Sequence, residues 1–264
     1  MPNYRGISPE TNGGADLGST TQKWGKLYAN HVLTAGSLYR RRTRKTFTLA
    51  DLEAAVADGD YAARDIDVGD YYVGASGYTY ILAGDNTMKG YVSSNHAALV
   101  VNTHSETKWN LTESTAGGYV ASNLHSYLVN TALPKCQEDL GLDHLYSQTK
   151  IYSTAVDNSR VNRTGRVTGA SSDYASSTNQ YICALSEIQV FGSIVWSSSG
   201  HDTGEANQQL ELFRRFCVQE IFGNYLWLRD IAGPGQASRL DLNGRVFNRD
   251  TNGNSIAVGL ILFH

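Results

Sequence analysis

The chain of 264 residues is poor in cysteine and proline, with three and four residues respectively. Cys136, Cys183 and Cys217 lie far apart, form no C-x-x-C pair and are odd in number. This spacing argues against a disulfide scaffold and a zinc site, and it is typical of synthesis in a reducing compartment. We expect Cys183 and Cys217 to be small, buried hydrophobic residues.

Long hydrophobic runs and targeting signals are also lacking. The longest apolar stretch, 256–263, is too short to cross a bilayer, so we expect no membrane insertion. No basic segment followed by an apolar one comes after Met1, which predicts no secretory signal. With 41% hydrophobic and 10% aromatic residues the chain can bury a core, which argues against disorder, collagen and coiled coil.

Charged residues are scarce, at 18%, and unevenly distributed. Five of the six residues 40–45 are basic, whereas the rest of the chain carries 17 basic and 25 acidic residues. A nucleic-acid-binding protein spreads positive charge over a face, so we expect no nucleic-acid partner. We predict that 40–45 is a solvated tether; contact with an acidic partner surface or with nucleic acid is the alternative.

Composition divides the chain into three parts. Residues 1–39 are too poor in apolar residues to close a core of their own, so they must pack on another protein or on copies of themselves. We expect a homotrimer, because closed symmetry buries such residues. The tether 40–45 follows, and 46–264 is predicted to be an α+β domain with two or three helices and short antiparallel strands. The residues expected to join the copies are Leu17, Trp24, Leu27 and Tyr28.

Hydrophobic periodicity predicts the helices of the third part. Thr48 is the expected N-cap of a helix that ends at 58–60 and has Leu52 and Val56 on its apolar face. Two further helices are expected at 121–131 and 136–140, the second ended by Gly141. Pro134 either begins a continuation or bends the chain between them.

Strands are predicted where residues alternate in polarity or form short apolar runs: 66–73, 78–82, 97–101, 181–195, 226–229 and 255–263. The segment 181–195 is the most apolar of them and is expected to be central. The segments 197–208 and 230–254 are predicted to be polar loops. Six apolar residues are expected in the core or at its flank: Ile182, Leu185, Ile188, Val190, Trp227 and Leu228.

Motifs for catalysis are missing. The sequence has no G-x-S-x-G, no H-E-x-x-H and no Walker loop, so we expect no enzyme and no cofactor. The aspartates between 58 and 70 sit in turn-like positions and the seven histidines show no ligand spacing, so we expect no catalytic residue and no metal site. Residues 250–254 resemble a calcium loop without its final glutamate, which favours a turn at Asn252 and Gly253.

The segment 230–254 combines arginine, asparagine and glycine, a composition typical of adaptable recognition surfaces. Planar guanidinium groups suit carboxylated or phosphorylated polymers. The alternative is that the segment is ordinary surface. The candidate binding residues are Gln236, Arg239, Asn243, Arg245, Asn248, Arg249 and Asn252.

Residues 16–28, D-L-G-S-T-T-Q-K-W-G-K-L-Y, resemble a segment of bacteriophage tail-fibre and other virion proteins. In such proteins D-L-G-S followed by W-x-x-L-Y marks one unit of an intertwined, β-rich stalk. The resemblance implies that 1–39 anchors the chain to other virion proteins and joins its copies.

Residues 46–264 resemble a domain of unknown function found in phage minor structural proteins and bacterial surface proteins. The family's closing G-V-R-P-like turn is replaced here by A-V-G-L at 257–260. The resemblance implies a C-type-lectin-like fold without the calcium and sugar motifs of true lectins. Five motifs carry it, in order: I-D-V-G-D-Y at 66–71, G-G-Y-V-A-S at 117–122, L-S-E-I-Q-V-F-G at 185–192, Q-L-E-L-F at 209–213 and W-L-R at 227–229.

Together these likenesses predict a non-enzymatic virion protein, assembled in the host cytoplasm, whose third part is a display domain. The expected function is host attachment, as part of a tail fibre or tail tip that binds a host cell-surface receptor or glycan. A capsid decoration or head-fibre protein with a mainly structural role is the alternative. A depolymerase of envelope glycans is a third, more remote reading.

Overall fold

The computed structural model describes residues 43–85, 94–153, 174–193, 195–196 and 209–264. The helices and strands of the described residues belong to one compact unit, 44–264. The expectations for 1–39, including Leu17, Trp24, Leu27 and Tyr28, and for the loop 197–208 lie outside the described residues. The unit 44–264 is an α+β domain, as the sequence predicts.

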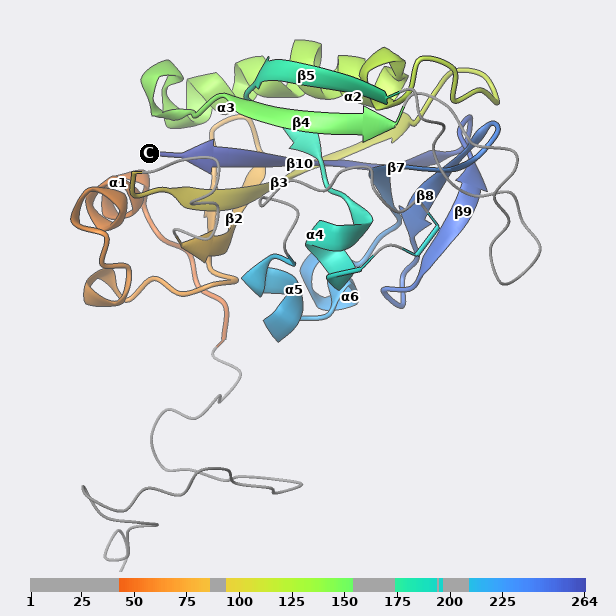
Figure 1. Ribbon diagram of the computed structural model, residues 1–264. Coiled ribbons are helices and arrows are strands. Elements are labelled where there is room, and N and C mark those ends of the chain that lie inside the picture. The colour runs from red at the N-terminus through yellow and green to blue at the C-terminus, as the bar shows by residue number, and fades with distance from the viewer. Residues whose placement is uncertain (1–42, 86–93, 154–173, 194, 197–208) are drawn as a thin grey trace, which may run out of the picture. The chain divides into compact units, whose positions relative to one another are not determined.

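An eight-stranded sheet runs through this unit (Figure 1). Its order is β1-β2-β3-β10-β7-β8-β9, with β6 paired to β10, and neighbours are antiparallel except β10 and β7. β3 and β10, with 12 and 10 residues, are longer than the short strands predicted. A separate two-stranded sheet pairs β4 (Gln148–Ser153) with β5 (Tyr174–Gln180) in antiparallel orientation. The sheet strands are β1 (Tyr71–Val73), β2 (Thr79–Asp85), β3 (Ala97–Lys108), β6 (Cys183–Ala184), β7 (Leu226–Gly233), β8 (Gln236–Leu240), β9 (Val246–Asp250) and β10 (Asn254–Phe263).

Helix α1 (Leu49–Asp58) confirms the first predicted helix. The side chain of Thr48 accepts a hydrogen bond from the amide of Asp51 (3.1 Å), which satisfies a free N–H of the first turn. Gly59, with a φ of 68°, ends the helix in the left-handed conformation that glycine adopts without strain. The buried residues of this helix are Leu52, Ala55 and Val56.

The second helical region is more continuous than predicted. Helix α2 (Asn123–Tyr127), a π-helical turn (Leu128–Ala132) and α3 (Leu133–Leu140) follow one another directly. Pro134 lies in the first turn of α3, where its missing N–H costs little, so it begins a continuation of the helix. Gly141 follows the last residue of α3, as predicted.

The prediction of a central strand at 181–195 is wrong. Within this segment β6 has two residues, and α4 (Glu187–Phe191) follows it. Ser186 and Gln189 form a capping box, in which each side chain accepts a hydrogen bond from the other residue's amide (3.2 and 3.0 Å). This reciprocal pair starts a helix despite the apolar, strand-like composition.

With α5 (Glu211–Arg215) and α6 (Val218–Phe222), the described residues contain six α-helices, which corrects the prediction of two or three. The three helices that were not predicted, α4 to α6, have five residues each, too few for the periodicity that indicates a helix. None of the helices in the described ranges is long and apolar enough to cross a membrane.

Two hydrophobic clusters pack on opposite faces of the sheet. One joins α1, α2 and α3 to strand residues such as Trp227, and the other joins α4, α5 and α6 to residues such as Leu228. Figure 1 shows α2 and α3 on one side of the sheet and α4 to α6 on the other. Five of the expected core residues are buried, which confirms the prediction for these five, whereas Ile188 is half-buried in α4.

The two cysteines that were expected to be buried differ. Cys183 is buried in β6, as predicted, whereas Cys217 is exposed. Cys217 is the N-cap residue of α6, where the chain turns between two short helices, and its neighbour Val218 takes the inward position. The prediction for Cys217 is therefore wrong.

The prediction of a loop at 230–254 is also wrong. β7 extends to Gly233, and β8 and β9 continue the sheet with regular antiparallel pairing. Ala237 and Leu240 are fully buried, one in each hydrophobic cluster. These two apolar residues are enough to place β8 in the sheet, because the polar residues beside them form hydrogen bonds within the fold. The chain does turn at 251–253 before β10, as predicted.

Gly74 lies where the turn between β1 and β2 meets α3. A Cβ atom at this position would collide with the carboxylate of Asp139. That carboxylate cannot move freely, because it accepts hydrogen bonds from the amide of Ser76 (3.0 Å) and the hydroxyl of Tyr80 (2.6 Å). The approach of the turn to α3 therefore requires glycine.

We expect Gly74→Ala to lower the free energy of unfolding by about 1–3 kcal/mol, the usual cost of overpacking. Urea denaturation followed by circular dichroism measures the change. Ala75→Ser, at the exposed neighbouring position, is the control and should change stability by less than about 0.5 kcal/mol. Equal stability of the two variants would contradict the contact.

Candidate ligand-binding surface

The seven candidate residues do not form one surface. Side chains alternate along a strand, so residues paired across two strands share a face and their chain neighbours take the other. The structure divides the seven into Arg239 and Arg249 on one face of β8 and β9, Gln236 and Asn248 on the opposite face, and Asn243, Arg245 and Asn252 in the turns.

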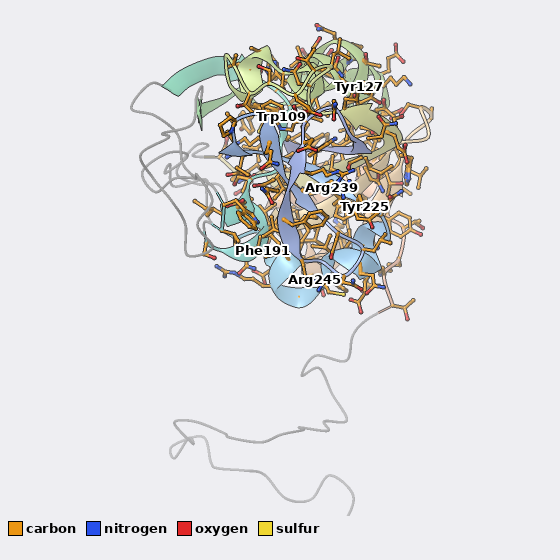
Figure 2. The ribbon with its side chains drawn as sticks, turned by 90° about the vertical axis from the view of Figure 1, so that its right-hand side faces the viewer. Trp109, Tyr127, Phe191, Tyr225, Arg239 and Arg245 are labelled. Carbon is orange, nitrogen blue, oxygen red and sulfur yellow. The ribbon has the colours of Figure 1, made fainter. Side chains whose placement is uncertain are left out.

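Arg239 lies between two aromatic rings. Its guanidinium carbon is 4.3 Å from the ring centre of Tyr225, and Figure 2 shows these two residues side by side. The ring centre of Phe247, the partner of Arg239 across β9, is 4.8 Å away. Both distances are those of cation–π contacts. Its Nε is buried and has no hydrogen-bond partner in the described part of the chain. The rings therefore hold the planar group in place, and because Nε is buried, the donors left for a ligand are the terminal Nη groups, which have no partner among the described residues.

Arg249 lies on the same face and is exposed. It pairs with Ala237, two residues along β8 from Arg239. Burial, and then the charge of Arg249, lower the pKa of the Arg239 guanidinium, against the opposite effect of Tyr225 and Asp241. Among the described residues no carboxylate lies within ion-pair distance of either arginine. Two neighbouring cations without a counterion favour the binding of an anion.

Arg245 differs because it has a partner within the protein. Its Nε donates to Oδ2 of Asp241 (3.0 Å), while the amides of Asn243 and Arg245 donate to Oδ1 (2.8 Å each). Burial acts to raise the pKa of Asp241, but these donors outweigh it and the pKa lies below its ordinary value. Arg245 and Asn243 thus stabilise the turn between β8 and β9.

The remaining candidates also bind within the fold. The side-chain amide of Asn248 donates to Oε1 of Gln236 (2.6 Å), and that of Gln236 donates to Oδ1 of Asp250 (3.0 Å). The amide of Asn252 donates to Oε1 of Glu113 (3.1 Å). The geometry therefore favours Arg239 and Arg249 as ligand contacts over the other five candidates.

Sequence reasoning missed Tyr225 and Phe247, the residues that orient Arg239. For Phe247 the sequence did contain a signal. Residues 245–249 read R-V-F-N-R, and if this segment is a strand, Phe247 and Arg249 lie on the same face. The expectation of a loop hid that alternation. Tyr225 precedes β7, and nothing in the sequence pairs it with a residue 14 positions later.

A second polar cluster lies on the other face of β8 and is buried. Glu187 accepts hydrogen bonds from the amides of Val195 (2.6 Å) and Trp196 (3.0 Å) and from the hydroxyl of Ser238. The amide of Glu187 donates to Oδ2 of Asp230 (2.8 Å). These contacts tie α4 and the chain after it to β7 and β8, which is a structural role.

The aspartates of the turn region have partners within the fold. Asp58 pairs with Arg64 (2.8 Å) and Asp67 with Arg215 (2.7 Å), and buried Asp70 accepts from the amide of Lys45 (2.9 Å). Across the described ranges, no three His, Cys, Asp or Glu side chains are grouped to hold a metal ion. The expectations of no enzyme, no cofactor and no metal stay predictions.

Fold and site together define an α+β domain that presents a pair of arginines without counterions on one sheet face. No protein-family model matches the chain, and no curated protein and no solved structure matches it significantly.

Proposed function

We propose that this protein is a bacteriophage virion component whose C-terminal domain attaches the particle to its host, as part of a tail fibre or tail tip. The support comes from the likeness of 16–28 to tail-fibre stalks and from the five ordered motifs of 46–264. A C-type-lectin-like fold is part of the proposal, and the α+β architecture is compatible with it.

The pair Arg239 and Arg249 is the observation that carries attachment. A guanidinium with available donors, beside a second cation, matches the carboxylate or phosphate groups of acidic envelope polymers. Because the rings of Tyr225 and Phe247 already fix Arg239, little side-chain entropy is lost when a ligand binds. The ligand class we propose is therefore an anionic surface polymer of the host.

Binding of the full chain to host cells tests this proposal. The double variant Arg239→Ala, Arg249→Ala is expected to bind at least about tenfold more weakly, because both anion contacts are lost. The matched control is Lys135→Ala, Arg214→Ala, which removes the same charge from exposed positions outside β8 and β9 and should bind like the unmodified chain. Thermal melting verifies that all variants fold. Unchanged binding by the first variant would favour capsid decoration or a head fibre instead.

Soluble competitors identify the anion. A polyuronate carries carboxylates and a polyphosphate carries phosphates, the two anionic groups that suit guanidinium. The polymer that displaces the chain from cells at the lower concentration identifies which of these groups the ligand carries. If neither polymer competes although the Arg239→Ala, Arg249→Ala variant binds cells more weakly than the unmodified chain, the attachment role stands but the proposal of an anionic ligand is wrong.

A homotrimer formed through 1–39 is the proposed assembly, and the same segment is proposed to bind other virion proteins. Three copies of a weak site gain about 10²–10⁴ in avidity when they engage together. In the full chain, Trp24→Ser with Leu27→Ser should convert the trimer to a monomer, because these are among the few apolar residues available for burial. Light scattering measures the mass. A monomeric unmodified chain, or a trimeric variant, would refute the assembly.

A further inference from the structure

A pocket of about 470 Å³ lies where α1, the residues before β3, the segment after α3 and the end of β10 meet. Figure 1 shows the C-terminal end of β10 beside α1, at the end of the domain away from β9 and the two arginines. The volume lies within the range of small-molecule sites. Four segments far apart in the sequence thus build a hollow that the attachment proposal does not use.

The hydrogen bonds of His144 define its chemistry in this pocket. Its Nδ1 is 2.9 Å from the main-chain oxygen of His264, which can only accept, so Nδ1 carries the proton. In the neutral ring Nε2 is then an acceptor, and it lies 3.9 Å from Oε1 of Glu53. The side chains of His144 and Glu53 are 41% and 42% exposed, so donors from outside the protein can reach both acceptors. Two hydroxyl groups of a ligand are donors of this kind.

Flat rings form other parts of the wall. The rings of Tyr146 and His264 stack with centres 4.0 Å apart and planes at 28°. The ring of His144 stacks on Phe263, with centres 5.2 Å apart. Burial is the largest of the causes that hold the pKa of His264 below its ordinary value. The lining therefore offers aromatic surface, one carboxylate and neutral polar groups.

We propose that this pocket binds a single neutral sugar residue through two adjacent hydroxyl groups, which donate to Glu53 and to Nε2 of His144. The C–H face of the sugar packs on the aromatic wall, and Asn95 supplies a further polar group at the rim, where the hydroxyl of Ser94 is hydrogen-bonded to that of Tyr146. An anion is disfavoured by the Glu53 carboxylate, and the described residues give a metal ion too few ligands. An ammonium compound could donate to the same acceptors, but it cannot accept from the rim, and it is the competing occupant.

Titration of the full chain with methyl glycosides of glucose, galactose and mannose, followed by NMR of the imidazole C–H groups of His144 and His264, tests the proposal. At least one glycoside should give saturable shifts of both rings with millimolar-class affinity, as suits one small ligand. Glu53→Gln should weaken binding about tenfold, because a hydrogen bond to a charged acceptor becomes a weaker one to a neutral amide oxygen. Glu138→Gln, on the exposed side of α3, is the control and should bind normally.

Ala57→Trp provides a second variant, because a large side chain at this exposed lining position should block the pocket without entering the core. Three results would overturn the proposal: no shifts with any glycoside up to about 0.1 M, unchanged affinity in both Glu53→Gln and Ala57→Trp, or saturable shifts with methylammonium but not with sugars. None of these outcomes depends on Arg239 or Arg249, so the attachment proposal is tested separately.

Discussion

Replacing Trp227 with alanine is expected to lower the free energy of unfolding by about 3–5 kcal/mol, the usual cost of removing a buried Trp ring. Trp227 is fully buried in β7 and is one of the largest such side chains in the domain. Its Nε1 donates to the main-chain oxygen of Thr107 (2.9 Å), which ties β7 to the end of β3. The variant leaves both a cavity and an unsatisfied carbonyl.

Urea denaturation followed by circular dichroism measures this loss. Leu111→Ala is the control, because Leu111 is a large apolar residue that is 67% exposed and should contribute less than about 0.5 kcal/mol. Trp227→Phe keeps part of the ring volume and should fall between the two. If Trp227→Ala unfolds at the same urea concentration as Leu111→Ala, the placement of β7 in the core is wrong.

Glu187→Ala is expected to cost about 3–5 kcal/mol, because it removes one member of a buried, hydrogen-bonded network. The carboxylate accepts from two amides, those of Val195 and Trp196, and from the hydroxyl of Ser238. Its loss leaves the buried hydroxyl of Ser238 and the partly buried amides of Val195 and Trp196 without this acceptor. The expected result is early unfolding of the chain around α4.

Thermal melting and hydrogen exchange measure that result. Glu138→Ala is the matched control, since Glu138 is exposed on α3 and loses no buried contact. Protection of the Val195 and Trp196 amides should fall in the Glu187→Ala protein and persist in the control. Full protection in both would show that the carboxylate does not hold this segment.

Much of the fold could be predicted where local chemistry decides the structure. Thr48 and Gly59 mark the ends of α1 because capping depends on neighbouring residues alone. The strands β2 and β10 also followed from short-range signals, since alternating polarity marks the first and a long apolar run forms the second. The five buried core residues were found for the same reason.

The errors arose where distant residues decide the structure. The segment 181–195 is as apolar as a central strand, but the capping box of Ser186 and Gln189 starts a helix within it. The segment 230–254 looked like a loop because polar residues such as Ser238 are buried there against partners 40 or more positions away. Composition alone cannot reveal such pairings.

The candidate site was predictable in part for the same reason. Residue type was enough to select the arginines of 230–254 as candidates. The sequence does not distinguish these three arginines from one another, although their surroundings in the fold differ. Asp241 binds Arg245, whereas Tyr225 and Phe247 enclose Arg239. Which cation remains available depends on strand register, and register is a property of the folded sheet.

The central claim is that the guanidinium of Arg239, held between two rings, contacts the anionic polymer of the host. Arg239→Lys tests it most directly, because lysine keeps the charge but cannot present two parallel N–H donors from between the rings. Surface plasmon resonance of the full chain on purified host envelope polymer measures the affinity. The account predicts that Arg239→Lys binds about tenfold more weakly and that Arg245→Lys binds as the unmodified chain does. Equal binding by all three proteins would contradict the claim.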